Sequence, residues 1–395
     1  MKPYYSEARV FSLALPPMSP GKQPSNKAKG KGRIESPMNL VKCLLDWFKS
    51  NARDLPWRRT TDPYAVWVSE IMLQQTQVAK VIPYWRRWMK AFPSIRHLAD
   101  ADIQDVLFQW QGLGYYSRAR NLHKAAGLIA RELDGQFPES PDTMETLPGI
   151  GDYTRGAISS IAFDLPLPAV DGNVIRVLSR IRKITDNVGL SPTKQLIRNE
   201  ALALVMAADR MRSETHPRAC SSLNQSLMEL GATVCTPTSP SCHSCPVRPH
   251  CLAFRAGIQE SLPLKTVTRK RIRHYHTIWI VSHRNKCLVT RHGEGDWNAG
   301  LHHFPYTVDQ ESWLKSENLA GLAPIPVDRE TITHIGDFTH TITHNFFNCR
   351  VVSASAVKNA DWRRHPENFM WIHPRDSRNL AWSGAHLKVL NLLGW

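Results

Sequence analysis

The sequence predicts a protein in two parts, a mainly α-helical part at residues 38–258 and an α+β part at residues 276–395. Apolar residues in the first part recur every three or four positions, which is typical of amphipathic helices. In the second part this spacing changes, and two short apolar runs on either side of a polar turn at residues 283–286 are typical of paired β-strands. Residues 259–275 hold a proline and five basic residues, and this composition predicts a linker. The length of 395 residues agrees with two domains.

The helical spacing recurs through the first part in segments separated by short polar or Pro/Gly breaks. We expect helices at residues 40–48, 66–73, 83–92, 103–109, 117–133, 153–163, 172–182, 194–211 and 223–230. The second of these is apolar on all sides, so we expect it to be buried. No segment of this part alternates, so we expect no sheet in it. In the second part, strands are predicted at residues 276–281, 287–290, 331–335 and 346–352.

The charge balance indicates a polyanionic partner. The formal net charge is +16 and the isoelectric point is near 9.6, which favours nucleic acid without proving it. Residues 1–37 predict a disordered basic extension, either an arm that touches DNA or a solvated tail. Twelve of the seventeen histidines follow residue 273 at irregular spacing, and we expect them to be solvated or to face DNA. No apolar run has the length of a membrane span, so we expect a cytoplasmic protein with no membrane partner.

Four cysteines lie within seventeen residues and predict a metal site. Cys235, Cys242, Cys245 and Cys251 have the spacing C-x6-C-x2-C-x5-C. Zinc sites usually space both cysteine pairs closely, and only one pair here is close. Iron–sulfur clusters accept looser spacing. The spacing alone leaves both metals open.

A short turn with two glycines predicts a helix–hairpin–helix motif. Gly149 and Gly151 follow Pro148 and precede the helix predicted at residues 153–163. Such a turn directs backbone N–H groups outward at a helix N-terminus, where they attract a phosphate oxygen without reading base sequence. A turn between any two packed helices has the same pattern, so the motif needs support from other signals.

Two carboxylates are candidates for catalysis. Glu70 lies inside the apolar segment 66–73, where lost hydration should raise its pKa towards neutrality, as a general acid requires. The alternative is a buried ion pair with an arginine such as Arg53 or Arg58. Asp171 precedes the helix predicted at residues 172–182, whose dipole should keep it ionised. Local sequence favours an N-cap role, which does not exclude stabilisation of an oxocarbenium ion.

Together these segments resemble the MutY family of adenine DNA glycosylases, in the helix–hairpin–helix superfamily that includes endonuclease III. The resemblance runs from about residue 39 to residue 262 and rests on motifs at residues 55–58, 69–76, 112–118, 147–151, 170–173 and 230–235. It implies a helix–hairpin–helix glycosylase domain with a [4Fe–4S] cluster on the four clustered cysteines. It also implies double-stranded DNA as the partner of a monomeric enzyme in base excision repair.

The resemblance implies a role for each candidate residue. Glu70 would protonate N7 of an adenine flipped out of the duplex, and Asp171 would stabilise the oxocarbenium ion that remains. Tyr153 and Asn173 would hold these two groups in place. The positions that line the adenine pocket are matched by Arg53, Leu55, Trp57, Arg58 and Gln225. Gln75 and Tyr115 match positions that intercalate beside the lesion. Gly149 and Gly151 match positions that bind the DNA backbone.

Tyr153 stands where bifunctional relatives carry a lysine that forms a Schiff base with the sugar, so we expect base removal without efficient strand cleavage. Two alternatives remain. One is a bifunctional glycosylase/lyase similar to endonuclease III. The other is a non-enzymatic DNA-binding protein with a structural metal, which would not need Glu70 and Asp171 together.

Residues 276–395 resemble the family's Nudix-like module, which recognises 8-oxoguanine opposite the adenine. The similar segments are residues 299–305 and 338–344, and no Nudix hydrolase box of spaced glutamates is present. Where the family has Phe-Ser-His, this chain has Ile342, Thr343 and His344. The resemblance therefore implies that Thr343 and His344 contact the lesion. The expected substrate is a duplex with adenine opposite 8-oxoguanine or guanine.

Overall fold

The computed structural model describes residues 37–266, 271–309, 323, 325–357 and 369–395. Most of the extension predicted at residues 1–37, and residues 267–270 of the predicted linker, lie outside these ranges. In the described chain up to residue 266, the α-helices are α1 Pro37–Asn51, α2 Pro63–Leu73, α3 Val78–Ala91, α4 Ile95–Asp100, α5 Ile103–Trp110, α6 Ser117–Glu132, α7 Pro141–Glu145, α8 Asp152–Ile161, α9 Gly172–Ile181, α10 Ser191–Asp209, α11 Ala219–Thr233 and α12 Leu252–Arg255. None of the helices in the described residues is long and apolar enough to span a membrane.

The predicted helices are confirmed, although five of them begin three to five residues before their predicted starts. The helix expected at residues 83–92 begins at Val78, so Pro83 lies inside α3. Val81 and Trp88 of this helix are fully buried, and their packing outweighs the backbone hydrogen bond that Pro83 cannot donate. The short helices α4 and α7 were not predicted, because five or six residues give too little periodicity to identify.

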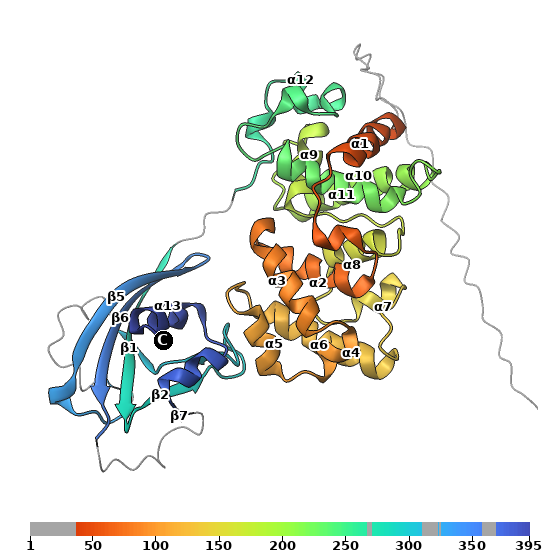
Figure 1. The fold of residues 1–395 in the computed structure, drawn as a ribbon. Helices are drawn as coiled ribbons and strands as arrows, with labels where there is room; N and C mark the ends of the chain where they lie inside the picture. Colours follow the sequence, from red (N-terminus) through yellow and green to blue (C-terminus); the bar gives the residue numbers. More distant parts are fainter. Residues whose placement is uncertain (1–36, 267–270, 310–322, 324, 358–368) are drawn as a thin grey trace, which may run out of the picture. The chain divides into compact units, whose positions relative to one another are not determined.

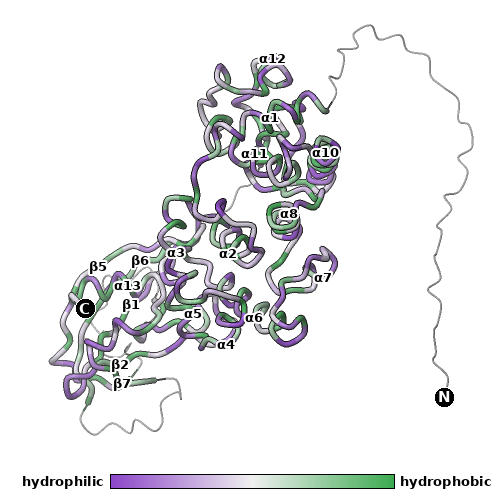
Figure 2. The backbone as a smooth tube through the Cα atoms, turned by 45° about the vertical axis from the view of Figure 1, so that its right-hand side comes forward, coloured by the Kyte–Doolittle hydropathy of each residue, from purple (hydrophilic) through white to green (hydrophobic). Residues whose placement is uncertain are grey.

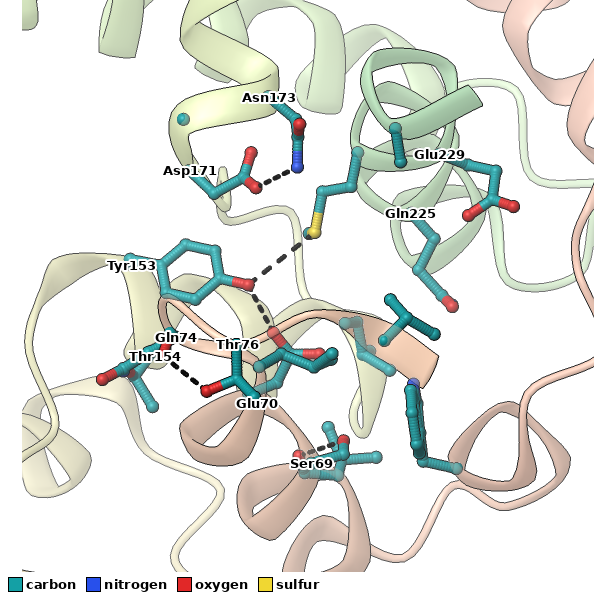
Figure 3. Close-up of a pocket in the computed structure, with 18 of the residues that line it drawn as sticks. Ser69, Glu70, Gln74, Thr76, Tyr153, Thr154, Asp171, Asn173, Gln225 and Glu229 are labelled. Carbon is teal, nitrogen blue, oxygen red and sulfur yellow. Dashed lines mark hydrogen bonds between the residues drawn. The ribbon is translucent and has the colours of Figure 1, made fainter. Parts of the chain in front are cut away.

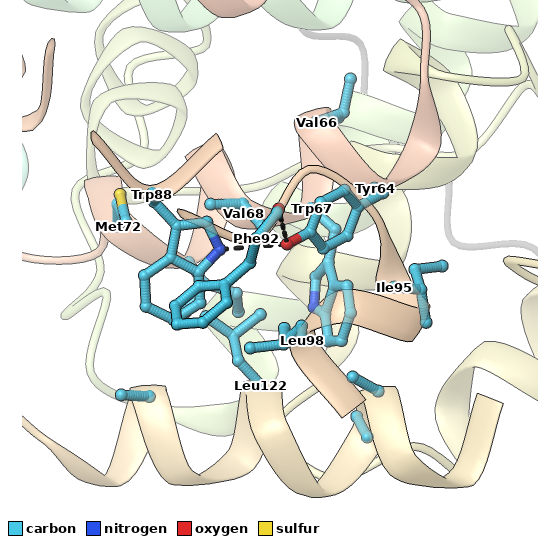
Figure 4. Close-up of a cluster of buried hydrophobic side chains, with 14 of the residues drawn as sticks. Tyr64, Val66, Trp67, Val68, Met72, Trp88, Phe92, Ile95, Leu98 and Leu122 are labelled. Atoms are coloured by element: carbon cyan, nitrogen blue, oxygen red, sulfur yellow. Dashed lines mark hydrogen bonds between the residues drawn. The ribbon is translucent and has the colours of Figure 1, made fainter. Parts of the chain in front are cut away.

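The helices pack into two groups, each with its own core. Helices α2 to α8 enclose one core, and α1 joins α9, α10 and α11 around the other (Figure 1). In the first core, the Tyr64 hydroxyl donates to the carbonyl of Phe92 at 2.8 Å and accepts from Trp88 Nε1 at 3.2 Å (Figure 4). Hydrophobic and hydrophilic segments alternate along most helices, as amphipathic packing requires (Figure 2).

The described residues of the C-terminal part form a mixed sheet and one α-helix, so the predicted α+β class is confirmed. The strands are β1 Ile272–His283, β2 Lys286–Arg291, β3 His302–His303, β4 Tyr306–Asp309, β5 Thr333–Ile342, β6 Asn345–Ser355 and β7 Met370–Ile372, and the helix is α13 Gly384–Leu393. The sheet order is β3-β2-β1-β6-β5, with β4 paired to β1 and β7 paired to β2. Strand β1 starts four residues before its predicted start, because Ile272 already pairs with Asn345 of the parallel strand β6.

Several histidines of this part are buried, so the expectation that they are solvated or face DNA is wrong for them. His302, His303 and His386 are each at most 9% exposed. The His276 ring stacks on Tyr306 with 4.8 Å between ring centres. Burial lowers the pKa of His276 and His303 to about 4, which leaves both rings neutral at pH 7. These side chains therefore pack as aromatic residues do.

Candidate active site

A pocket of about 680 Å³ in the helical part is lined by residues from both helix groups. Figure 3 shows the side chains of α2, α8, α9 and α11 that point into it. The pocket brings together twelve residues that the sequence analysis predicted for the site: Arg53, Leu55, Trp57, Arg58, Glu70, Gln75, Gly149, Gly151, Tyr153, Asp171, Asn173 and Gln225. The prediction that these distant segments form one site is consistent with this geometry.

Glu70 is a buried carboxyl on the wall of this pocket. Glu70 is 5% exposed, and its side chain projects from the last turn of α2. Burial raises the pKa of Glu70 to about 7, and the nearby Asp171 adds to the rise. The Tyr153 hydroxyl donates a hydrogen bond to Glu70 Oε2, which opposes the rise (Figure 3). Glu70 is thus able to carry a proton near pH 7, as a general acid must.

The ion pair that the sequence offered as an alternative for Glu70 belongs to another residue. Arg53 Nε donates to Glu229 Oε1 at 2.6 Å, and Arg58 Nη2 donates to Glu229 Oε2 at 2.9 Å. The Glu229 side chain is 1% exposed, and its two arginines hold the pKa of the carboxyl at about 2. Arg58 also donates to Gln225 at 3.1 Å. The sequence analysis missed Glu229, although it has the same signal as Glu70, an acid flanked by apolar residues in a helix.

Asp171 is the N-cap of α9 and also lines the pocket. Its Oδ1 accepts from the Val174 N–H at 2.8 Å, and its Oδ2 accepts from Asn173 Nδ2 at 2.7 Å. Asn173 is held in turn by Arg176, which also donates to the carbonyl of Cys235. The expectation that the helix dipole sets the ionisation of Asp171 needs correction. Burial raises its pKa, and the hydrogen bonds at the N-cap only oppose that rise.

The hairpin between α7 and α8 contains the tight turn that its two glycines predict, and DNA-backbone binding there stays a prediction. Gly149 has φ of +81°, and a Cβ there would lie 2.8 Å from Asn121 Cβ, so only glycine fits. Gly151 is the N-cap of α8, and a Cβ there would meet no atom within 4 Å. The open space at Gly151 leaves the N-terminus of α8 accessible to an anion.

Two turns beside the pocket are held in strained conformations by one buried arginine. Gln75 has φ of +56° and Tyr115 has φ of +48°. Arg118 donates to the carbonyls of Gln74 and Gly114, at 2.8 and 3.1 Å, and so ties the two turns together. Tyr115 does not line the pocket and is 44% exposed. The sequence analysis assigned no role to Arg118, because no local pattern shows that its guanidinium also reaches carbonyls within residues 71–74.

The four clustered cysteines follow α11 and end at the start of α12. All four line one cavity, together with Arg180 and Arg248, and none forms a disulfide. Arg180 Nη1 lies 3.3 Å from Cys235 Sγ. In the part of the chain that the structure describes, no three metal-binding side chains are grouped as a single metal ion requires.

The predicted lesion-reading residues form a two-residue turn between β5 and β6. Ile342 pairs with Asn345, so Thr343 and His344 are at the tip of the hairpin. Thr343 has φ of +56°, an unusual conformation for a β-branched residue. Its hydroxyl lies 3.2 Å from His344 Nδ1.

The sequence of this chain is similar to those of known DNA repair proteins. Residues 68–205 match the HhH-GPD superfamily of base excision DNA repair proteins. The adenine DNA glycosylase of Mus musculus is 34% identical over 407 residues, which cover 88% of this chain and 76% of the mouse protein. That of Rattus norvegicus is 46% identical over 408 residues, covering 88% and 77%. The chain belongs to the adenine DNA glycosylase family.

A likeness to solved structures accompanies this match. A thermostable thymine-DNA glycosylase superposes with a TM-score of 0.48 and 24% identity, covering 56% of this chain and 97% of that protein.

Proposed function

We propose that this protein removes adenine from duplex DNA during base excision repair, with Glu70 as the general acid. The observation that carries the proposal is the pair of carboxyls in one pocket, the buried Glu70 with a pKa of about 7 and the partly buried Asp171 beside it. A purely structural DNA-binding protein has no need for two neighbouring carboxyls whose desolvation costs free energy of folding. A single-turnover excision assay on a duplex with adenine opposite guanine tests the proposal.

In the proposed reaction, the proton of Glu70 moves to N7 of the flipped adenine. The bond between C1′ and N9 then breaks, and its electron pair leaves with the neutral base. The Asp171 carboxylate stabilises the positive charge on the sugar until a water oxygen bonds to C1′ and the water gives one proton to the Glu70 carboxylate, which restores the acid. Asn173 holds the Asp171 carboxylate through the 2.7 Å hydrogen bond to Oδ2. Arg58, Gln225 and Glu229 form a connected wall that can orient the adenine.

We propose that the enzyme is monofunctional, because no lysine is among the residues that line the pocket within the described chain. Replacing Tyr153 by lysine places an amine next to Glu70, where it can attack C1′. Tyr153→Lys is expected to cut the abasic strand without alkali and to be trapped on DNA by borohydride. Tyr153→Phe, the matched control, is expected to need alkali, as the wild type does. Borohydride trapping of the wild type would show that another lysine acts as a lyase.

We propose that Cys235, Cys242, Cys245 and Cys251 hold a [4Fe–4S] cluster, which binds one thiolate at each iron. Four thiols that line one cavity support a cluster, and the wide spacing between Cys235 and Cys242 favours it over zinc. The purified protein is then expected to be yellow-brown with broad absorption near ~400 nm. Cys242→Ser is expected to weaken this absorption, whereas Cys349→Ser, in the C-terminal sheet, should keep it. A colourless, fully active protein with zinc and no iron would contradict the assignment.

We propose that the Thr343–His344 turn distinguishes 8-oxoguanine from guanine opposite the adenine. Its strained Thr343 backbone supports a binding role, since such conformations persist mainly at functional sites. The double variant Thr343→Ala, His344→Ala is expected to lose roughly 1–3 kcal/mol of discrimination between the two duplexes. Single-turnover rates on both duplexes measure the loss. Thr333→Ala, at the other end of β5, serves as the control, and an unchanged preference in the double variant would place lesion reading elsewhere.

A further inference from the structure

Among the described residues, one face of the C-terminal sheet is covered at one end and left uncovered at the other. At the covered end, Trp279 of β1 and Val352 of β6 are buried beneath residues such as Ile325. At the other end, a groove of about 900 Å³ is lined by residues of this face, Arg271, Arg273, Tyr275, Asp337, Thr339, Phe346 and Asn348, and by Phe338 and Cys349, whose side chains alternate to the opposite face. The pairing of Arg273 with Phe346 places both side chains on this face.

The groove is positively charged. Arg271 and Arg273 are exposed, and neither has an ion-pair partner among the described residues. Asp337 is the one carboxylate among the lining residues, and it lies 2.9 Å from His334 and 3.9 Å from Arg350. The two arginines are therefore available to bind an anion, whereas the Asp337 carboxylate already contacts His334 and Arg350.

The Arg271 side chain is also oriented by an aromatic ring. Its guanidinium carbon lies 5.2 Å from the centre of the Phe346 ring, a cation–π contact that limits its rotamers. Arg273 is two residues further along the strand, so the two side chains leave the same face roughly 7 Å apart. This separation is close to that of consecutive phosphates on one DNA strand.

The groove begins next to the Thr343–His344 turn. The Ile272 N–H, between the two arginines, donates to the His344 carbonyl at 2.9 Å. An anion bound by Arg271 and Arg273 would therefore lie beside the turn. A DNA backbone that passes this turn offers a row of such anions.

We propose that Arg271 and Arg273 bind consecutive backbone phosphates of duplex DNA beside the Thr343–His344 turn. The proposal rests on the proposed function only in that the protein must bind duplex DNA. Arginine on phosphate carries no sequence information, so this contact positions the turn and leaves base recognition to other residues. Phe346 fixes the direction of the Arg271 guanidinium.

The test is the salt dependence of binding to an undamaged, fluorescently labelled duplex, measured by anisotropy with the full chain. Each phosphate contact contributes about −0.9 to the slope of log K against log salt. Arg271→Gln, Arg273→Gln is expected to make this slope shallower by about 2. Arg271→Lys, Arg273→Lys should keep most of the slope, because the charge remains.

Arg284→Gln, Lys286→Gln is the matched control, with the same loss of charge at the exposed β1–β2 turn. It should keep the wild-type slope. If the glutamine variant at 271 and 273 also keeps it, or if the control loses as much, the proposed phosphate site is wrong while the proposed function stands. A wild-type protein that binds no duplex at all would overturn both.

Discussion

Glu70→Gln is expected to slow adenine excision by at least ~10²-fold while DNA binding persists. Glutamine has nearly the same shape and can still accept the hydrogen bond from Tyr153, but it has no acidic proton to give to adenine. Single-turnover rates at saturating enzyme measure chemistry apart from binding. Glu132→Gln, an exposed change on α6, should leave the rate unchanged. A near-normal rate in Glu70→Gln would remove Glu70 from the mechanism.

The same substitution is expected to stabilise the fold above neutral pH. The pKa of Glu70 is about 7 in the folded protein, whereas a glutamate in the unfolded chain has the ordinary value of 4.5. The unfolded protein therefore loses this proton at lower pH. Stability from the protonated carboxyl is fully present below pH 4.5 and is lost as pH rises through 7. Above pH 7 the buried charge costs about 3 kcal/mol, and glutamine removes that cost.

Thermal unfolding of both proteins between pH 5 and pH 8 checks this sign. The difference in melting temperature between Glu70→Gln and the wild type should grow with pH and level off above pH 7. The wild-type excision rate should fall over the same range. A difference in melting temperature that does not change with pH would show that Glu70 is not a buried group with a raised pKa.

Glu229→Gln is expected to destabilise the helical part by about 3 kcal/mol. The substitution leaves Arg53 and Arg58 without the buried charge that they share. The effect should be at the lower end of the range for broken buried pairs, since the Arg53 side chain is 39% exposed. Excision should fall as well, because Arg58 and Gln225 lose their common anchor on the pocket wall.

Denaturant unfolding of Glu229→Gln measures this loss. Glu200→Gln is the control, because it breaks a half-exposed pair with Arg182 and should cost no more than about 1 kcal/mol. Equal losses in the two variants would mean that the Glu229 pair contributes no more than a surface ion pair.

The sequence predicted most helices and the buried acid, because both depend on local patterns. Glu70 is surrounded in the chain by apolar residues, and burial with a raised pKa follows from that. Asp171 was misjudged because its local position shows the helix dipole but not the desolvation that other segments impose. Arg118 and the buried histidines were missed for the same reason. Part of their surroundings comes from distant segments, such as Gln74 for Arg118 and Ala381 for His302, and no periodicity reveals it.

The most direct test of the central claim is a cleavage assay on duplexes that carry adenine opposite 8-oxoguanine, guanine or thymine, each with and without alkali. We expect excision of adenine opposite 8-oxoguanine and guanine, little opposite thymine, and strand breaks only after alkali. Glu70→Gln should bind the same duplexes and leave them intact. A wild-type protein with a bound cluster that binds these duplexes but removes no adenine would contradict the account.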